Sequence, residues 1–483
     1  GPKLYNNNGD RMELIRHLPY IKDMSPNTWS KFKASEDALR DLFGLYNYQP
    51  IESPLLEPTE LFVRKSGGEL AAQMYTFTEP GGSQVSLRPE FTSSVIRNVL
   101  SRSETNVTPM RVHYSGPVFR FFQDGQRRQF TQVGAEFLHA SGQRSDVEIL
   151  TLSSHTLTHL GLTKYKLVLN DSGIIGALLK QLGLSKRTQI FILNSVGDFK
   201  DGKKSVEKVR RRAKYIGLLN HPHNKSIIDA SCKPMNKASI REEIEELLQS
   251  SDGVVPGQRE PDEIAERYIG KVEGTDNPSV VEKGLILASR LAIIKGRPET
   301  TLKKARELVI SNDLEDSCLD YIDQLIHLMA QNEPTVPLIL DFGLARGMGY
   351  YTGIVFDITH PNSPFPLGGG GRYDDLAQTL GSPNSVPACG FAHNLEQVME
   401  ACEREGTPPF ETIREKPVLV WPRNSRAYNA GLMKAKTLRA KGITVELDVS
   451  VVSLPEAIKY AEQSNIGRII IVEENGEITK HAI

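Results

Sequence analysis

An acidic residue near the end of a predicted strand is the first candidate for ligand-binding chemistry. The segment LRPEFT places Glu90 directly after a proline and two residues after Arg88. A carboxylate that is buried at such a position requires a cationic partner. Taken alone, the segment is equally consistent with a surface ion pair between Glu90 and Arg88.

A second segment, GPVFRFFQDGQRRQFTQVGAEF, combines arginines with polar residues at strand spacing. Alternate residues of a strand point to the same side, so Gln132 and Glu136 are expected to face one pocket. Arg120 can offer a planar guanidinium group to a carboxylate or a phosphate, which the point charge of a lysine does less well. The alternative is that these side chains and Arg128 form the solvated face of an amphipathic strand.

Two later segments could bring backbone and polar side chains close to a ligand. In LARGMGYYTG, Arg346 supplies a positive charge, and Tyr350 and Tyr351 supply phenol groups next to flexible glycines. The run GGGG ends at Gly371, before Arg372, and would let the backbone pass beside a substrate. The run lacks the GxxxxGK[ST] spacing of a P-loop, so it could equally be a simple turn.

Length and composition limit the classes of protein to which the chain can belong. A chain of 483 residues is expected to form two or three domains. The 58 basic and 59 acidic residues give a formal net charge of -1, so any contact with RNA must be local. Four widely separated cysteines predict no disulfide framework and no metal site, which indicates a reducing, cytoplasmic environment. No apolar run approaches the roughly 18 to 20 residues that span a bilayer, so no membrane partner is expected.

The elements that must position these residues belong mainly to a predicted antiparallel sheet. Residues 27–46 have apolar side chains at helical spacing, and an extended segment with three prolines follows them. The segments MYTFTEPGGSQVSLRPEF and RVHYSGPVFRFFQDGQRRQFTQVGAEFLHA each predict strand, turn and strand. A charged helical pattern comes next, as in SIREEIEELLQ, PDEIAERYIGKV and VVEKGLILASRLAIIKG. Strand character then returns at VPLILDFGLARGMGYYTGIVFDI, so the sheet is expected to form from both sides of a helical insertion.

These patterns predict an α+β protein in which a split core precedes a separate C-terminal domain. The expected parts are the first part of the core (1–150), the insertion (151–334), the second part of the core (335–406), a linker (407–416) and an α/β domain (417–483). Basic residues of the last domain could contact phosphates or simply keep a helix soluble. They are Arg423, Arg426, Lys434, Lys436, Arg439 and Lys441.

The motifs RPE, FR, RQFxQxGxE and ARGxxYYTG, in this order and separated by a helical insertion, make the chain resemble the histidyl-tRNA synthetases. The resemblance covers most of the chain. It implies a class II synthetase core with an antiparallel sheet and an anticodon-binding-type C-terminal domain. It further implies that histidine reacts with ATP, accompanied by Mg²⁺, to form histidyl-adenylate, and that the histidyl group is then transferred to tRNA(His). Pro54 and the helix before it resemble the class II dimer motif, which implies a homodimer.

The resemblance also assigns roles to individual residues. The residues that would bind histidine are Glu90, Thr92 and Gln132 at its amino group, and Glu136 and Tyr351, with Tyr350, at its imidazole. The catalytic pair would be Arg120 and Arg346, because fixed positive charge stabilises the negative charge that builds up during in-line attack. The residues that would bind ATP are Arg120, Arg128, Gly370 and Arg372. No metal-ligating side chain is expected.

Several positions depart from the family pattern. Gln397 stands where the family has an arginine that contacts the γ-phosphate of ATP, and Asn394 stands where it has glycine. Phe91 replaces a glycine, Gly349 replaces an aspartate, and FRFFQDGQ lacks an acidic residue after its arginine. These differences fall mainly on residues that would bind ATP, and they leave two other functions open. One is a histidine-binding regulatory subunit that partners the ATP phosphoribosyltransferase catalytic subunit, and the other is a tRNA-sensing protein without catalysis; the C-terminal domain favours a tRNA partner.

Overall fold

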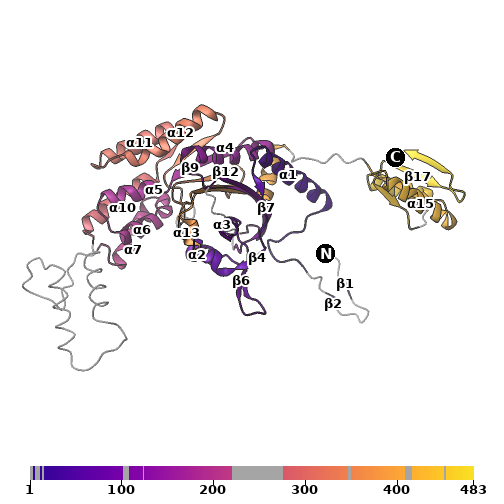
Figure 1. The fold of residues 1–483 in the computed structure, drawn as a ribbon, viewed down its shortest axis with the longest axis horizontal. Helices are drawn as coiled ribbons and strands as arrows, with labels where there is room; N and C mark the ends of the chain where they lie inside the picture. Colours follow the sequence, from indigo (N-terminus) through magenta and orange to yellow (C-terminus); the bar gives the residue numbers. More distant parts are fainter. Residues whose placement is uncertain are drawn as a thin grey trace, which may run out of the picture. The chain divides into compact units, whose positions relative to one another are not determined.

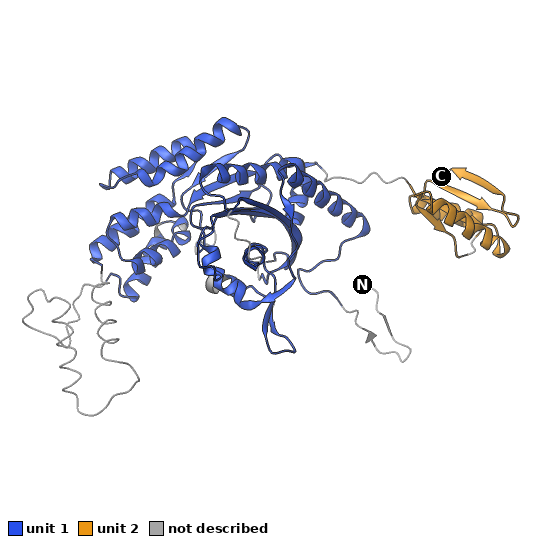
Figure 2. Ribbon diagram, viewed as in Figure 1, with its two compact units in different colours: residues 1–410 blue, residues 411–483 orange. Residues whose placement is uncertain are grey.

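The chain forms two compact units, residues 1–410 and 411–483 (Figure 2). The structure is a computed structural model that describes residues 4–5, 11–12, 16–101, 108–122, 125–219, 276–345, 350–407, 416–450 and 453–482. The division between the units falls inside the stretch 407–416, which the sequence predicts to be a linker.

Within the described residues, the first unit is organised around a nine-stranded sheet with the strand order β10-β11-β9-β12-β13-β14-β8-β7-β3. Its strands are β3 (Gln49–Pro50), β7 (Met110–Phe119), β8 (Gln129–Leu138), β9 (Lys166–Asp171), β10 (Lys295–Gly296), β11 (Leu338–Asp341), β12 (Ile354–Thr359), β13 (Gly368–Arg372) and β14 (Ala388–Asn394). All neighbouring strands are antiparallel except the pairs β3–β7 and β9–β11. The predicted α+β class, with a mainly antiparallel core, is confirmed.

Among the described elements, one face of the sheet is covered by three amphipathic helices. They are α1 (Pro26–Leu45), α4 (Gln143–His159) and α14 (Leu395–Glu405). Helix α1 begins where the Ser25 hydroxyl accepts a hydrogen bond from the Thr28 N–H, with a proline at the first helical position. Its residues Phe32, Leu39 and Phe43 are buried in the main core, so the helix is held by its apolar stripe.

The opposite face of the sheet carries shorter elements, as Figure 1 shows. They are α2 (Thr59–Ala71), α3 (Thr92–Ser101), α13 (Leu376–Thr379) and a small antiparallel sheet of β4 (Leu56–Pro58), β5 (Thr76–Thr78) and β6 (Gln84–Leu87). Their apolar side chains form a second core with the sheet, centred on Phe91, Tyr114 and Phe130. This face is the one on which the polar residues of the candidate site gather.

The remaining described elements of the first unit are mostly helical. They are β1 (Leu4–Tyr5), β2 (Arg11–Met12), α5 (Gly173–Gln181), α6 (Lys186–Asn194), the 3₁₀ helix η1 (Gly197–Asp201), α7 (Lys203–Tyr215), α10 (Pro278–Ala292), α11 (Pro298–Ile310), the 3₁₀ helix η2 (Ser317–Leu319) and α12 (Asp320–Asn332). The predicted helices in SIREEIEELLQ and PDEIAERYIGKV lie outside the described residues. Helix α4 runs through residue 151, the expected start of the insertion, and β9 joins the central sheet. Its residues Leu167 and Leu169 face one core and Val168 faces another, as a strand buried on both faces requires.

The second unit is a small α/β domain. It contains β15 (Val418–Pro422), the 3₁₀ helix η3 (Ser425–Ala427), α15 (Tyr428–Arg439), β16 (Val445–Leu447), α16 (Leu454–Gln463), β17 (Arg468–Val472) and β18 (Ile478–Ala482). Strands β16, β15 and β17 are parallel and β18 is antiparallel, so the predicted α/β class of this domain is confirmed and its sheet is mixed. Among the described residues of both units, no helix combines the length and apolar character needed to cross a membrane.

Candidate functional site

The sheet face beneath α2 and α3 has a floor made of glycines. A Cβ atom at Gly390 would lie 1.7 Å from Oε2 of Glu136, and one at Gly134 would lie 2.7 Å from the hydroxyl of Tyr114. A Cβ at Gly371 would lie 2.8 Å from the ring of Tyr351. Because no side chains rise from these positions, the polar groups of neighbouring strands can lie flat against the sheet.

Glu136 is the most enclosed carboxylate on this floor. Its Oε1 accepts hydrogen bonds from the hydroxyls of Thr92 (2.7 Å) and Tyr114 (3.0 Å), and its Oε2 accepts one from the hydroxyl of Tyr373. Burial raises the pKa of Glu136 to about 7, although the three hydroxyl donors and the charge of Lys65 oppose this effect. Glu136 can therefore change its protonation state near neutral pH.

A second carboxylate, Glu90, lies next to Glu136 and has a different environment. Its Oε2 accepts a hydrogen bond from Nζ of Lys65 at 2.9 Å, and both of its oxygens accept from the N–H of Ser93. Burial favours the neutral acid, but the charge of Lys65 and the hydrogen bonds from Ser93 outweigh it and lower the pKa of Glu90. Beside this pair, Oε1 of Gln132 accepts from the N–H of Phe91 at 3.2 Å. Glu90 therefore holds a negative charge, balanced by a buried lysine.

Tyrosine rings line this carboxylate cluster. The ring centroids of Tyr350 and Tyr351 lie 4.1 Å apart, and that of Tyr373 lies 6.3 Å from Tyr350. Nζ of Lys65 lies 4.4 Å from the ring centroid of Tyr350, a cation–π geometry. Arg346, the other residue expected in this segment, lies outside the described residues.

A groove of about 80 Å³ extends from Gln132 towards α14 and is lined by two arginines. Arg120 donates from Nε to the carbonyl of Pro89 at 2.8 Å, and its guanidinium lies over the ring of Phe130. Arg127 forms an ion pair with Glu400. No carboxylate is found among the described residues that line the groove, so they suit a phosphate rather than a metal ion, and we assign no step to the expected Mg²⁺.

Two residues that depart from the family pattern also line this groove. Asn394 is the N-cap of α14, and its Oδ1 accepts a hydrogen bond from the N–H of Gln397 at 3.1 Å. The asparagine therefore has a clear role in beginning the helix. Gln397 contributes a neutral side chain to the groove. Among the described residues that line it, Arg120 and Arg127 are the arginines that can supply positive charge.

Arg128 and Arg372, which are both expected to contact ATP, lie outside the residues that line this groove. Arg128 donates from Nε to the carbonyl of Phe122 and stacks on the ring of Phe121, outside the residues that line the groove. The Arg372 side chain projects from β13 towards α4, where it forms a buried ion pair with Asp146. Its five N–H groups are fully used by the partners Ala140, Gly142, Ser145, Asp146 and Asp374.

Gly370 is also explained by strand packing. A Cβ at this position would lie 2.0 Å from the carbonyl oxygen of Gly390 on the neighbouring strand. Gly368, at the start of the same glycine run, lines the groove instead. In the part of the chain that the structure describes, no group of three or more His, Cys, Asp or Glu side chains is placed to hold a metal ion.

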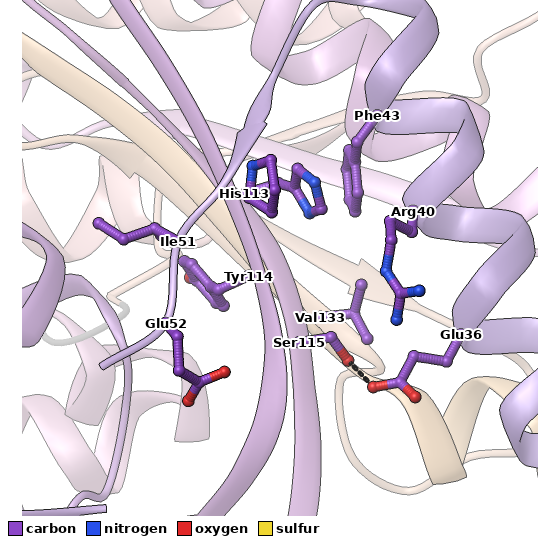
Figure 3. A pocket seen from close by; sticks show the side chains of 10 residues that line it. Glu36, Arg40, Phe43, Ile51, Glu52, His113, Tyr114, Ser115 and Val133 are labelled. Atoms are coloured by element: carbon purple, nitrogen blue, oxygen red, sulfur yellow. Dashed lines mark hydrogen bonds between the residues drawn. The ribbon is translucent and has the colours of Figure 1, made fainter. Parts of the chain in front are cut away.

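A separate cavity of about 220 Å³ lies between α1 and β7, as Figure 3 shows. There the hydroxyl of Ser115 donates to Glu36 at 2.5 Å, and the ring of His113 stacks on Phe43 with centroids 4.9 Å apart. Burial and the nearby charge of Arg40 lower the pKa of His113 to about 4. The imidazole is therefore neutral at pH 7 and acts as a packing group of the helix-covered face.

Comparison with known proteins identifies the family. The sequence profile described as "Histidyl-tRNA synthetase" matches residues 20–252 and 265–398. The chain belongs to the histidyl-tRNA synthetase family. A histidine–tRNA ligase from Pyrococcus furiosus is 28% identical over 465 residues, which cover 95% of this chain and 92% of the relative. One from Methanocaldococcus jannaschii is 25% identical, with 94% and 90% coverage.

Solved structures of the family share the fold. The apo histidyl-tRNA synthetase of Staphylococcus aureus matches with a TM-score of 0.60 and 21% identity, covering 97% of each chain. A Bacillus halodurans protein described as "an ATP phosphoribosyltransferase regulatory subunit/histidyl-tRNA synthetase" matches with a TM-score of 0.62 and 20% identity, covering 96% of this chain and 99% of that one. At these identities the likeness establishes the fold alone.

The structure brings together all six residues that the family resemblance assigns to histidine. Those grouped on the glycine floor are Glu90, Thr92, Gln132, Glu136, Tyr350 and Tyr351. Sequence reasoning missed Lys65, Tyr114 and Tyr373. Tyr114 and Tyr373 could have been found by strand alternation, since each occupies a position facing the floor. No sequence signal marks Lys65, which lies on a helix 25 residues before Glu90.

Proposed function

We propose that the protein activates L-histidine with ATP and transfers the histidyl group to tRNA(His). The observation that carries this proposal is the pair of buried carboxylates with contrasting environments on the glycine floor. Glu90 is held ionised and suits the ammonium group of an amino acid, whereas Glu136, whose pKa is near 7, suits an N–H group of imidazole. Buried polar groups of this kind strongly disfavour a ligand that leaves them unpaired.

On the histidine side, the proposed roles follow the contacts of the carboxylates on the glycine floor. Among the described residues, the hydrogen-bond donor to Oε1 of Glu90 is the N–H of Ser93, so this oxygen can still receive an ammonium group. The hydroxyls on Glu136 hold its carboxylate in place, and an imidazole N–H would add a further donor. Thr92 connects the two subsites. It lies two residues after Glu90 in the sequence, and its hydroxyl donates a hydrogen bond to Glu136.

On the nucleotide side, we assign the phosphates to Arg120 and Arg127. Their guanidinium groups line one groove that begins at Gln132, next to the histidine pocket. Fixed positive charge at this point would stabilise the negative charge that develops when the carboxylate of histidine attacks the α-phosphate. Arg127 would supply the charge that Gln397 lacks. By the family resemblance, Arg346 would act with Arg120, and Mg²⁺ would accompany ATP.

The tRNA partner is supported by a local concentration of positive charge. Helix α7 presents five exposed basic side chains among its described ones, Lys204, Lys208, Arg211, Arg212 and Lys214, of which Arg212 is paired with Asp198. Such a face can bind RNA phosphates even though the whole chain is nearly neutral. The basic residues of the C-terminal domain would supply phosphate contacts of their own, although Arg423 is already paired with Glu473.

A homodimer is proposed from the open edge of the central sheet. The sheet ends at the two-residue strand β3, which pairs only with β7 among the described strands. Leu55 and Leu56, just beyond this edge, are 46% and 40% exposed. An open edge next to exposed leucines is a surface that a second copy of the chain would cover.

The test is histidine-dependent exchange of labelled pyrophosphate into ATP, which isolates the activation step from any requirement for the correct tRNA. We expect exchange in the wild type and its loss in Arg120→Ala and Arg346→Ala. A second function is favoured by the neutral Gln397 in the groove: a histidine-binding regulatory protein without activation. Calorimetric histidine binding without exchange would establish that function and refute the synthetase proposal. Absence of histidine binding would refute both.

A further inference from the structure

A buried lysine beside Glu90 has a position that the proposed reaction does not explain. Lys65 lies on α2, and its side chain is only 5% exposed. Its Nζ contacts Oε2 of Glu90 and lies over the ring of Tyr350. A lysine is seldom buried so completely unless it is paired, and here both contacts fix its ammonium group at the wall of the amino-acid pocket.

The lysine restricts which ligands Glu90 can accept. A ligand ammonium group that binds Oε1 of Glu90 would lie next to the ammonium group of Lys65, which occupies Oε2 of the same carboxylate. Glu90 is also buried, so little solvent is present to screen the repulsion between the two cations. A ligand is therefore favoured when it brings its own negative charge to this point. In an α-amino acid, the ammonium and carboxylate groups are attached to the same carbon, which meets this requirement.

We propose that Lys65 is a specificity-determining residue that selects α-amino acids over the corresponding amines and amino alcohols. The proposal rests on the proposed function, because it takes the glycine-floor pocket to be the histidine site. Lys65 remains on Glu90 when the ligand binds and forms a second ion pair with the ligand carboxylate. An imidazole ligand without a carboxylate would leave the two cations on Glu90 uncompensated.

The experiment compares L-histidine with L-histidinol, which keeps the imidazole and ammonium groups and has a hydroxymethyl group in place of the carboxylate. Isothermal titration calorimetry gives the ratio of the two dissociation constants for the full chain. We expect the wild type to favour histidine and Lys65→Met to reduce this preference at least about tenfold, the range of a lost charge-assisted contact. Lys65→Arg should restore most of the preference, because the positive charge returns.

The matched control is Arg64→Met, which removes an exposed charge from the neighbouring position of α2. It should leave the ratio unchanged. If Lys65→Met only lowers the stability of the fold, both ligands lose affinity equally and the ratio stays at the wild-type value, which would overturn the proposal. The double variant Lys65→Met/Glu90→Gln removes both charges of the pair, and a wild-type ratio in this variant would overturn the proposal as well. A wild-type protein that binds neither ligand would refute the proposed function itself.

Discussion

Replacing Gly390 with alanine tests whether the glycine floor sets the position of Glu136. The new Cβ would lie 1.7 Å from Oε2 of Glu136 and 2.6 Å from the carbonyl oxygen of Ala135. The backbone of β8 cannot give way, because it is paired on both sides, so the carboxylate must move away from its hydroxyl donors. Overpacking of this kind costs about 1–3 kcal/mol of folding stability.

The larger effect is expected on the ligand. A hydrogen bond to a charged group contributes about 1.5–3 kcal/mol, so loss of the imidazole contact should weaken histidine binding roughly 10- to 150-fold. Calorimetric titration with L-histidine and a thermal melt of the empty protein measure the two effects separately. The matched control is Gly44→Ala, at a helical glycine where the added Cβ meets nothing within 4 Å. It should leave both measurements unchanged or raise the Tm slightly. If Gly390→Ala binds histidine within about twofold of the wild type, Glu136 does not contact the ligand and our placement of the pocket is wrong.

Three further outcomes follow from the geometry of the site. The pKa of Glu136 is raised to about 7 from an ordinary 4.5, so its carboxyl group is neutral below pH 7 in the ligand-free protein. Ionisation of this group lowers the stability of the ligand-free protein as the pH rises from 4.5 through 7. The affinity for histidine, measured by calorimetry, should therefore increase by up to about tenfold from pH 6 to pH 8 in the wild type. The increase should be smaller in Glu136→Gln. An equal increase in the variant would exclude Glu136 as the titrating group. Arg127→Gln should raise the KM for ATP in pyrophosphate exchange about tenfold or more and leave the affinity for histidine unchanged, whereas an unchanged KM would remove Arg127 from the nucleotide site. Arg372→Met should lower the Tm, because it leaves the buried Asp146 without its cationic partner at a cost of about 3–5 kcal/mol. A raised KM for ATP at an unchanged Tm would instead support the expected role of Arg372 in ATP binding.

The sequence was sufficient to predict secondary structure and side-chain direction where local periodicity and residue chemistry agree. Alternation along RQFTQVGAEF placed Gln132 and Glu136 on the same side of a strand, and in the structure they contact the adjacent residues Phe91 and Thr92. The apolar stripe of residues 27–46 predicted α1 to within one residue at each end. Alternating strands and helices after residue 417 predicted the α/β domain. In each case the signal is contained in a few neighbouring residues.

Sequence patterns were misleading where a side chain could serve either of two faces. The family resemblance assigned Arg372 to ATP, yet its strand position directs it to Asp146 on the helix-covered face. Likewise, β9 falls within the expected insertion because it reads as a short apolar run, and only its pairing with β11 and β12 assigns it to the sheet. Strand pairing is a long-range property, and a short window of sequence does not encode it.

The sequence by itself determined the family, the fold class and the residue types of the proposed histidine pocket, because these depend on motifs whose order along the chain is specific. Only the tertiary structure decided which charges meet. Lys65 and Glu90 are 25 residues apart and on different elements, and their contact arises from the packing of α2 against the sheet. The pKa values of Glu90 and Glu136 differ for the same reason. Burial and the nearest donors control the ionisation of a carboxylate, and both are set by how distant segments of the chain come together.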